Sequence, residues 1–591
     1  MMKPKHWLAI LCATVMLLSL VACSGAPTAT SQAPEASTPA AASEAPASEA
    51  PSAEASSAAS EATSTPDDSS SAPMAKYDPP IDFTTVISLS DKMQNFIGTK
   101  PDVLTNNNWI NGYKNDLGIN VTYLWSVPGA QYEQKLNSQI AANDLPDVVN
   151  VNATQLKTLV DSGMVYDMTD VFAKNIAPFT QQMMDADNNV ALSQATFNGK
   201  LMALPSVSGN KDGVNMLWIR RDWLDKLGLK TPKTIDDLMA LAKAFTENDP
   251  DSNGKADTYG IAMNNTIYAG GLNDMTGLFE SFGVNPNGWI EGSDGKAAFG
   301  LIQPQIKDGL AMLAQMYKDG YMDKEFNTKD NSKVAEDLVA GKVGMFFGQH
   351  WVPFWPLQDG HNLNPNADWI AVAIPSKDGT PAMSMIHGSA GGFYAVNVDT
   401  KYPEAAVKLY NYNYMKDCAL SPEYDRNFHI PGTEEAAHPE ASYEWSIVKT
   451  FYPMQNLFIH RGVMKYLAGD KTQLENSWIN DNALASEKYL ADAANNGTQW
   501  SAYRWSGPEG SGFSVVDSYD TKNLMLQDLY IMGSTDGMVQ YNTTLNQLAL
   551  ETFTKIIMGQ VSVDEFDNFV TQWKSLGGDQ ITQEVNKAIG K

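Results

Sequence analysis

The stretch MLWIRRDWLDKLGLKTPKTIDDLMALAKAFTENDPDSNGKADTYG, residues 216–260, decides the fold class because a helix, a polar loop and a strand follow one another within it. Thr234 is suited to cap the helix, with Asp237 three residues on, as in a capping box. The apolar stripe of this helix consists of Leu238, Leu241, Ala242 and Phe245. This succession favours a chain of alternating α and β elements.

The loop after this helix has the ligand spacing of a calcium site. Counted from Asp249 as position 1, positions 1, 3, 5, 7 and 9 hold Asp249, Asp251, Asn253, Lys255 (through its carbonyl) and Asp257. Gly254 stands at position 6, where such a loop turns sharply, but position 12 is Gly260 and not the glutamate of an EF-hand. A plain turn is the alternative, because Asp-Pro and Asn-Gly are themselves turn formers. A single site of this kind suggests a structural staple and not a sensor.

The alternation continues on both sides of this stretch. A helix is predicted over 107–116, and one face of the strand that follows carries Ile119, Val121, Tyr123 and Trp125. The next predicted helix has its apolar residues at a spacing of four, namely Tyr132, Leu136 and Ile140. Near the C-terminus, a further amphipathic helix carries Phe566, Phe569, Trp573 and Leu576. We therefore predict an α/β architecture with helix-covered sheets.

The N-terminal residues predict export and lipidation. MMKPKHWLAILCATVMLLSLVACSG (1–25) has two early lysines and then an apolar run too short to span a bilayer comfortably. It ends in a sequence that resembles a bacterial lipobox, so residues 1–22 are expected to be a lipoprotein signal peptide and Cys23 the lipidated residue. An ordinary secretory signal with an accidental cysteine is the alternative. Residues 23–76 contain no aromatic side chain and are rich in Ala, Ser, Pro and Glu, which predicts a disordered linker that ends before Tyr77.

Composition limits the classes of partner. The chain of 591 residues is too long for one ordinary core, so two or more lobes are expected. A net charge of −27 argues against nucleic acid as a partner. It also mildly favours a neutral ligand, although a local basic site can coexist with an acidic exterior.

Several segments resemble the extracellular solute-binding proteins (family 1) of carbohydrate ABC importers, in particular their large lipoprotein branch with alginate- and oligosaccharide-binding members. The segments are LPDVV (145–149), FNGKLMALP (197–205), the opening stretch (216–260), GKVGMFFGQHW (341–351), KYPEAAVKLYNY (401–412) and ETFTKIIMGQVSVDEFDNFVTQWKSLGGDQI (551–581). The resemblance covers essentially all of 77–591, and these segments follow one another in the expected order.

The resemblance implies a two-lobed clamp of the periplasmic-binding-protein type (type II) with hinge-crossing segments. Lobe 1 would hold about 77–205 plus part of 386–591, and lobe 2 about 206–385 plus the remainder. The loop from Asp249 to Asp257 would then be a structural Ca²⁺ site. The implied role is a lipid-anchored monomer on the extracellular face of a Gram-positive cell membrane. It would capture an oligosaccharide between its lobes and deliver it to an ABC permease heterodimer or homodimer.

A sugar site needs flat aromatic platforms and polar partners. Core packing is the commoner role of a tryptophan, so we select tryptophans in loop-like or polar sequence. The candidates for ligand contact are Asn107, Trp109, Trp289, Trp351, Trp355, Arg504 and Trp505.

Other function classes stay open as alternatives. A binding protein for peptides or another non-sugar solute could use the same clamp. A surface glycoside hydrolase needs only two well-placed carboxylates. The segment IHGSAGG (386–392) nearly forms the G-x-S-x-G motif of hydrolases, but its first position is His387 and no helix clearly follows Ser389. We therefore predict no enzymatic activity.

Overall fold

The structure, a computed structural model, describes residues 72–269, 271–428 and 443–591. All of these belong to one compact unit, Asp67–Lys591. The predicted signal peptide, Cys23 and nearly all of the predicted linker lie outside the described residues. Within the part of the chain that is described, no helix is both long and apolar enough to cross a membrane.

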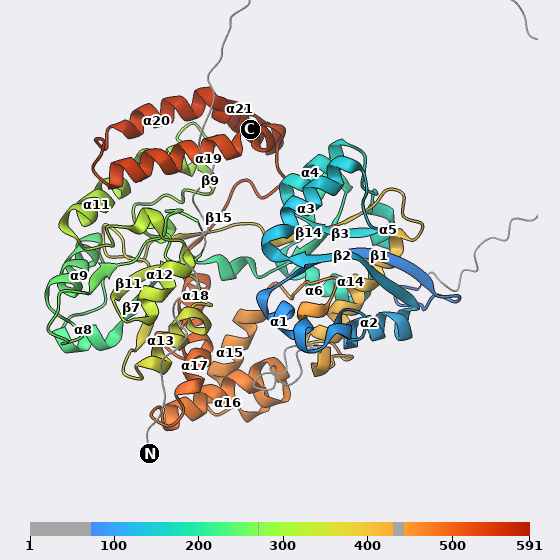
Figure 1. Ribbon diagram of the computed structural model, residues 1–591, viewed down its shortest axis with the longest axis horizontal. Helices are drawn as coiled ribbons and strands as arrows, with labels where there is room; N and C mark the ends of the chain where they lie inside the picture. Colours follow the sequence, from blue (N-terminus) through green and yellow to red (C-terminus); the bar gives the residue numbers. More distant parts are fainter. Residues whose placement is uncertain (1–71, 270, 429–442) are drawn as a thin grey trace, which may run out of the picture. The chain divides into compact units, whose positions relative to one another are not determined.

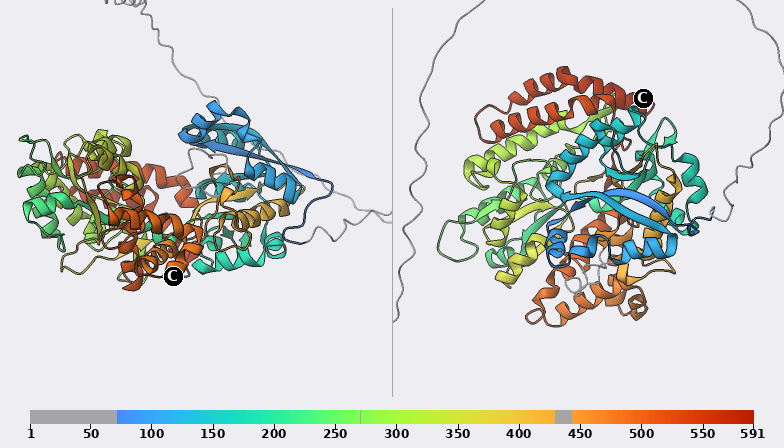
Figure 2. Two further views of the ribbon diagram at one scale, coloured as in Figure 1. Left: turned by 90° about the horizontal axis from the view of Figure 1, so that it is seen from below. Right: turned by 45° about the vertical axis from the view of Figure 1, so that its right-hand side comes forward.

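The described residues of the first region form three small sheets, one of them the short hairpin of β4 (Thr196–Phe197) and β5 (Lys200–Leu201). Strand β1 (Ile81–Leu89) pairs in parallel with β2 (Ile119–Pro128), and the pair forms the long twisted ribbon seen in both views of Figure 2. The second sheet has the order β3 (Val148–Val151), β14 (Ala390–Val396) and β6 (Leu204–Val207), with both pairs antiparallel. The helices of this region are α1 (Asp91–Thr99), α2 (Asn108–Gly112), α3 (Gly129–Ala142), α4 (Ala153–Asp161), α5 (Thr169–Asn175), α6 (Pro178–Met184), α7 (Val190–Gln194) and α14 (Pro403–Asp417).

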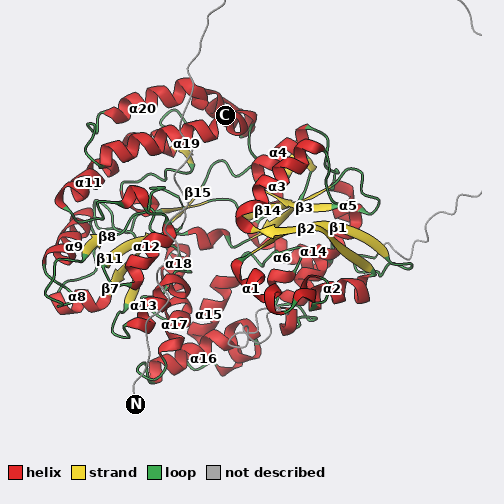
Figure 3. Cartoon of the chain, viewed as in Figure 1, coloured by secondary structure: helices red, strands yellow, loops and turns green. Residues whose placement is uncertain are grey.

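The second region is built on a four-stranded sheet, drawn in yellow in Figure 3, with the order β12 (Trp369–Val372), β7 (Met216–Arg220), β11 (Val343–Gly348) and β8 (Tyr259–Ile261). All five residues of β7 are buried, as expected for a strand covered on both faces. The helices here are α8 (Arg221–Leu227), α9 (Ile235–Glu247), α10 (Thr276–Ser281), α11 (Pro304–Asp319), α12 (Asn331–Val339) and α13 (Gln358–Leu363). A hairpin of β9 (Trp289–Glu291) and β10 (Ala297–Phe299) completes it.

The C-terminal third is mainly helical. Its first helices are α15 (Gln455–Leu467), α16 (Ser477–Ala491), α17 (Trp500–Ser506) and α18 (Gly512–Thr521). Strand β15 (Met525–Gln527) then pairs with β13 (Ser384–Ile386). The chain ends with α19 (Asp536–Ile557), α20 (Glu565–Trp573) and α21 (Asp579–Ala588), which lie together, with α11 beside α19 (Figure 1).

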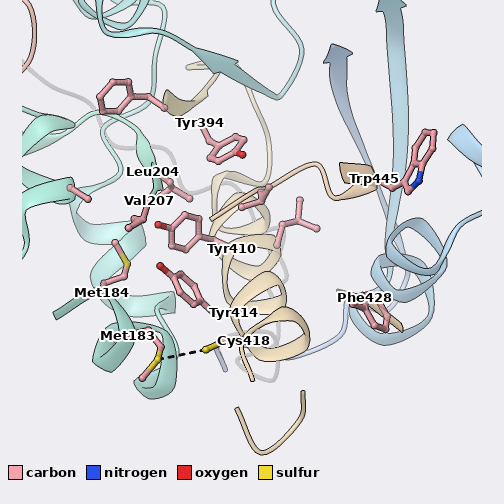
Figure 4. Packing of buried hydrophobic residues seen from close by; sticks show 14 of the residues in the cluster. Met183, Met184, Leu204, Val207, Tyr394, Tyr410, Tyr414, Cys418, Phe428 and Trp445 are labelled. Carbon is pink, nitrogen blue, oxygen red and sulfur yellow. Dashed lines mark hydrogen bonds between the residues drawn. The ribbon is translucent and has the colours of Figure 1, made fainter. Parts of the chain in front are cut away.

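Two hydrophobic clusters form the core. One contains the first region, α15–α18 and one face of the four-stranded sheet, with Trp218, Phe346 and Trp369. Figure 4 shows part of this cluster around α14, where the Cys418 thiol lies against Met183. The other contains most of the second region with α19–α21. Burial raises the pKa of the Cys418 thiol to about 12, so it is an unreactive core residue.

The predicted capping box is confirmed. Thr234 Oγ1 accepts a hydrogen bond from Asp237 N at 3.0 Å, and Asp237 Oδ2 accepts one from Thr234 N at 2.9 Å. The predicted stripe of α9 is buried. The predicted C-terminal stripe is right for Phe566, Phe569 and Trp573 but wrong for Leu576, which is 45% exposed in the turn Lys574–Gly578 after α20 has ended.

The first described residues are fastened to α14. The Lys408 ammonium donates to the carbonyl oxygen of Ala75, and Asn411 Nδ2 donates to that of Pro73 at 3.3 Å. The Tyr77 hydroxyl donates to Glu404 Oε1 at 2.8 Å. The same segment also contacts the residues before β2, where Lys76 Nζ donates to Asn115 O at 2.7 Å and Tyr77 N donates to Leu117 O at 2.9 Å, so all of these contacts lie in the first region.

Candidate functional site

An exposed aromatic surface follows strand β11. We call Trp351, Phe354 and Trp355 the aromatic platform. The rings of Trp351 and Trp355 are stacked, with centroids 6.4 Å apart and planes 10° from parallel. Trp355 is 42% exposed and Phe354 49% exposed. Two ring faces in this arrangement offer a flat apolar surface to a ligand.

The backbone explains why these rings point outward. Pro353 and Pro356 lie within the turn Pro353–Leu357, where they prevent a regular helix. Trp355 between them is extended, with φ −159° and ψ 129°. A residue in this conformation interrupts the helical ladder, so its ring does not follow the buried face of α13.

The platform rests on a second aromatic layer. Trp505 of α17 is buried, and its ring centroid lies 5.5 Å from that of Phe354. Its indole Nε1 donates to Nδ1 of His350 at 3.0 Å. Burial lowers the pKa of His350 to about 3, so the imidazole is neutral and can accept this bond. A Cβ atom at Gly512 would lie 2.9 Å from the Cα atom of His350, which explains glycine at the start of α18.

Arg504 is engaged within the protein. Its Nη2 atom donates to both carboxylate oxygens of Asp368, at 2.7 and 2.6 Å. The same carboxylate accepts a hydrogen bond from Trp500 Nε1 at 3.1 Å. Arg504 therefore joins α17 to the residue before β12, and in this structure it holds the support of the platform.

Asn107 and Trp109 lie in the core of the first region. Asn107 caps α2 by accepting from Ile110 N at 3.0 Å and donates to Val103 O at 2.7 Å. Trp109 is fully buried, and its ring centroid is 4.9 Å from that of Phe428. The surrounding rings leave no face of Trp109 open to a ligand.

Trp289 is also a core residue here. It is buried in β9 with its ring centroid 5.1 Å from that of Phe299, and its backbone N–H donates to Asp528 Oδ1 at 2.9 Å. Of the seven predicted contact residues, the structure thus brings together Trp351, Trp355, Arg504 and Trp505 around the platform. Phe354 is not among the predicted contact residues, because only tryptophans were selected in this segment. The turn that exposes Trp355 exposes the Phe354 ring as well.

The calcium-like loop is formed, with Asn253 at its centre. Asn253 Nδ2 donates to Asp251 Oδ2 at 2.7 Å and to Asp257 Oδ1 at 3.0 Å. Asp249 Oδ2 accepts from the backbone N–H of Gly254 at 3.1 Å. Among the described residues, no three acidic, histidine or cysteine side chains converge closely enough to hold a metal ion. The amide of Asn253 instead lies between carboxylates that a cation could join.

The segment with Ser389 and His387 does not form a hydrolase site. The Ser389 hydroxyl donates to Asp187, whereas His387 Nδ1 lies 2.9 Å from Asp528 Oδ2. Strand β14 follows Ser389 directly, so the strand-to-helix turn of a nucleophile elbow is lacking at this point.

Comparisons with known proteins agree on one family. Residues 104–414 match the family model described as bacterial extracellular solute-binding protein. The polygalacturonan/rhamnogalacturonan-binding protein YtcQ of Bacillus subtilis is 26% identical over 478 residues, which cover 78% of this chain and 84% of YtcQ.

Solved structures share the fold. An EF-hand mutant of the S. pneumoniae ABC-transporter substrate-binding protein FusA, in complex with fructo-nystose, has a TM-score of 0.59 at 17% identity and covers 86% of this chain and 99% of its own. The alginate-binding protein AlgQ2, solved without calcium ion, has a TM-score of 0.58 at 17% identity and covers 87% of this chain and 99% of its own. The chain therefore has the two-lobed α/β fold of periplasmic solute-binding proteins.

Proposed function

The chain belongs to the bacterial extracellular solute-binding proteins, and from that premise we propose that it is the substrate-binding component of an ABC importer for an oligosaccharide. The observation that carries the choice of ligand is the aromatic platform. The exposed indole ring of Trp355, with the partly buried ring of Trp351 stacked on it, fits the apolar face of a pyranose or furanose ring. YtcQ, with a polysaccharide in its name, supports the same ligand class.

Trp351, Phe354 and Trp355 are the proposed sugar contacts, and Trp505 and Arg504 are proposed to position them. Lobe 1 is proposed to hold about 77–205 plus part of 386–591, and lobe 2 about 206–385 plus the remainder. The separate sheets of the two regions support this division. A ligand that contacts both lobes would favour the closed form by its differential affinity for that form.

The proposed location is the outer face of the cell membrane. The lipobox-like sequence before Cys23 supports a lipid anchor, and one relative of 22% identity is the lipoprotein LipO of Bacillus subtilis. A membrane permease is the proposed partner, because solute-binding proteins of this class deliver their ligand to one. Lipid attachment can be tested by mass spectrometry of the purified full chain and of its Cys23→Ala variant.

A thermal-shift screen tests the ligand class. Residues 72–591 would be heated with plant, algal and host oligosaccharides, with mono- and disaccharides, and with peptides. We expect the melting temperature to rise with the concentration of one class of oligosaccharide, as mass action requires. A shift with peptides alone would replace the proposal with peptide binding. New reducing ends in the sugar samples would instead reveal a hydrolase.

We also propose a structural Ca²⁺ ion in the loop Asp249–Asp257. Asp249, Asp251, Asn253, Asp257 and the Lys255 carbonyl would hold it, with the Asn253 side chain turned so that its oxygen faces the ion. Bound Ca²⁺ would offset most of the negative charge of the three carboxylates and stiffen the loop after α9. Chelation should lower the melting temperature of the wild type but not that of Asp251→Ala. An equal decrease in both would show that the chelated ion does not bind in this loop.

A further inference from the structure

Two segments join the sheet of β6 and β14 to the four-stranded sheet, and we call them the two connections. Residues 208–215 lead from β6 to β7, and residues 384–389, which include β13, lead back to β14. Next to β14, Ser208 N donates to Ser389 O at 2.7 Å, and the Ser389 hydroxyl donates to the carboxylate of Asp187. The end of both connections nearer the first region is therefore fixed to that region.

The other end of both connections is fixed by the buried carboxylate of Glu280 on α10. The Ser384 hydroxyl donates to this carboxylate at 2.9 Å, and Met385 N donates to it at 2.8 Å. The side-chain amides of Asn215 and Asn285 donate to it at 3.3 and 2.8 Å. Asn215 N also donates to Ser384 Oγ at 3.0 Å. One side chain of the second region therefore holds both connections.

The part of the second connection that can bend between these anchors is short. His387 Nδ1 lies 2.9 Å from Asp528 Oδ2, and Asp528 Oδ1 accepts a hydrogen bond from Trp289 N of the second region. A Cβ atom at Gly388 would clash with the side chain of Gln194, which belongs to α7 of the first region. His387 is thus attached to one region and Gly388 to the other, so the backbone between them is where this connection can bend.

The carboxylate of Glu280 is buried among neutral partners. These partners are a hydroxyl, a backbone N–H and two side-chain amides, all of them donors. Neutral donors satisfy the ionised carboxylate, but they offset the free-energy cost of burying its charge less than a cation would. Burial raises the pKa of Glu280 to about 7. Near neutral pH, small changes in proton concentration therefore change its charge.

The surroundings of Glu280 give a proton a route from solvent. Besides the imidazole and carboxylate described above, the ionisable side chains near it are Tyr519 of α18 and, in the wall of a cavity of about 410 Å³ that Glu280 also lines, Lys377 and Asp378. Lys377 is paired with Asp308 at 3.1 Å. Exposed side chains line the same cavity, so it connects the buried carboxylate with the surface.

From this arrangement we propose that Glu280 is a proton-sensitive anchor of the hinge, which fixes both connections to the second region when it is ionised and releases them when it is protonated. An acid O–H cannot serve as an acceptor in the same way, so at least one of the four donors loses its partner. Bending would then extend beyond residues 387–388, and the rotation between the two regions would become broader. The inference goes beyond the proposed function, because it concerns movement of the ligand-free protein and holds for any solute.

The test follows the hinge with pH in ligand-free residues 72–591, which lie within one compact unit. Protection of the Met385 amide against hydrogen exchange, corrected for the intrinsic effect of pH, should fall roughly tenfold from pH 8 to pH 6, as when a hydrogen bond to a charged group is lost. Spin labels on Asp144→Cys and Lys318→Cys, at exposed positions of the two regions, would report the distance between the regions. The distribution of this distance should widen over the same pH range.

Three variants assign the response to Glu280. Glu280→Gln copies the shape of the protonated acid, so it should show the low protection and the wide distribution at every pH. His387→Gln removes the other ionisable side chain of the second connection and should keep the wild-type response. Glu551→Gln, at an exposed position of α19, removes the same charge elsewhere and should behave as wild type. Melting curves would show that each variant is folded.

The wild-type series alone can contradict the proposal. Unchanged protection and distances between pH 8 and pH 6 overturn it, whatever the variants show. A response that survives in Glu280→Gln, or that disappears in His387→Gln, also overturns it. A change in protection without a change in the distance distribution would confine Glu280 to a local role and exclude it as an anchor of the hinge. None of these outcomes affects the proposed sugar ligand, which the thermal-shift screen tests separately.

Discussion

Trp109 and Trp355 each lie beside residues that favour turns, but the ring of Trp109 is buried and that of Trp355 is exposed. Trp109 follows three asparagines at the start of α2, and Trp355 lies between prolines after β11. The first continues into a helix whose inner face meets α14, so its ring is enclosed by Phe428 and Tyr412. The second sits in a turn that cannot become a helix, and its ring stays at the surface. The backbone that follows a tryptophan, more than the polarity around it, decides whether the ring can meet a ligand.

The largest difference between the two sites should be in stability. Trp109→Ala removes a fully buried ring and should lower the free energy of unfolding by about 3–5 kcal/mol. Urea unfolding would measure it. The sugar affinity of the folded variant should be unchanged. A loss of affinity with unchanged stability would show instead that Trp109 contacts the ligand.

The ion pair of Arg504 and Asp368, which supports the platform, should contribute nearly as much to the free energy of unfolding. Arg504→Met leaves the Asp368 carboxylate without its main partner and should cost about 3 kcal/mol of stability. The double variant Arg504→Met/Asp368→Leu should recover part of this loss, because it also removes the stranded charge. If both variants are as stable as the wild type, the ion pair does not hold α17 in place.

Acid should weaken the platform region but not the Trp109 core. The pKa of His350 is lowered to about 3 in the folded protein, so below about pH 6.5 the unfolded chain binds the proton first. The contribution of neutral His350 to the free energy of unfolding is therefore complete above pH 6.5. It is lost towards pH 3, at roughly 1.4 kcal/mol per pH unit. His350→Gln, which can still accept from Trp505, should show a shallower loss of stability than the wild type between pH 6 and 4. Parallel curves would mean that His350 does not carry this dependence.

The smallest effect on stability should accompany the clearest effect on binding. Trp355→Ala removes a half-exposed ring, so the melting temperature should change little while sugar affinity falls roughly tenfold. Trp355→Phe should keep most of the affinity because a flat ring remains. Leu363→Ala, at the more exposed last residue of α13, is the matched control and should change neither quantity. Unchanged affinity in Trp355→Ala would exclude the platform as the sugar site.

The parts of this molecule that sequence could predict are those governed by neighbours in the chain. The α9 helix, its capping box and the alternating face of β2 depend on residues within a few positions of one another, and they are correct. Burial of Trp289 against Phe299 depends on a hairpin partner eight to ten residues away, and the proximity of Trp505 to His350 spans 155 residues.

The attachment of residues 73–77 to α14 has a mechanical consequence. If Cys23 is lipidated, a pull exerted through the N-terminal segment reaches contacts that all lie in the first region. The first region would then take this pull directly, and the second region would receive it only through the first. The first region would then stay close to the membrane, and ligand capture would depend on movement of the second region relative to it.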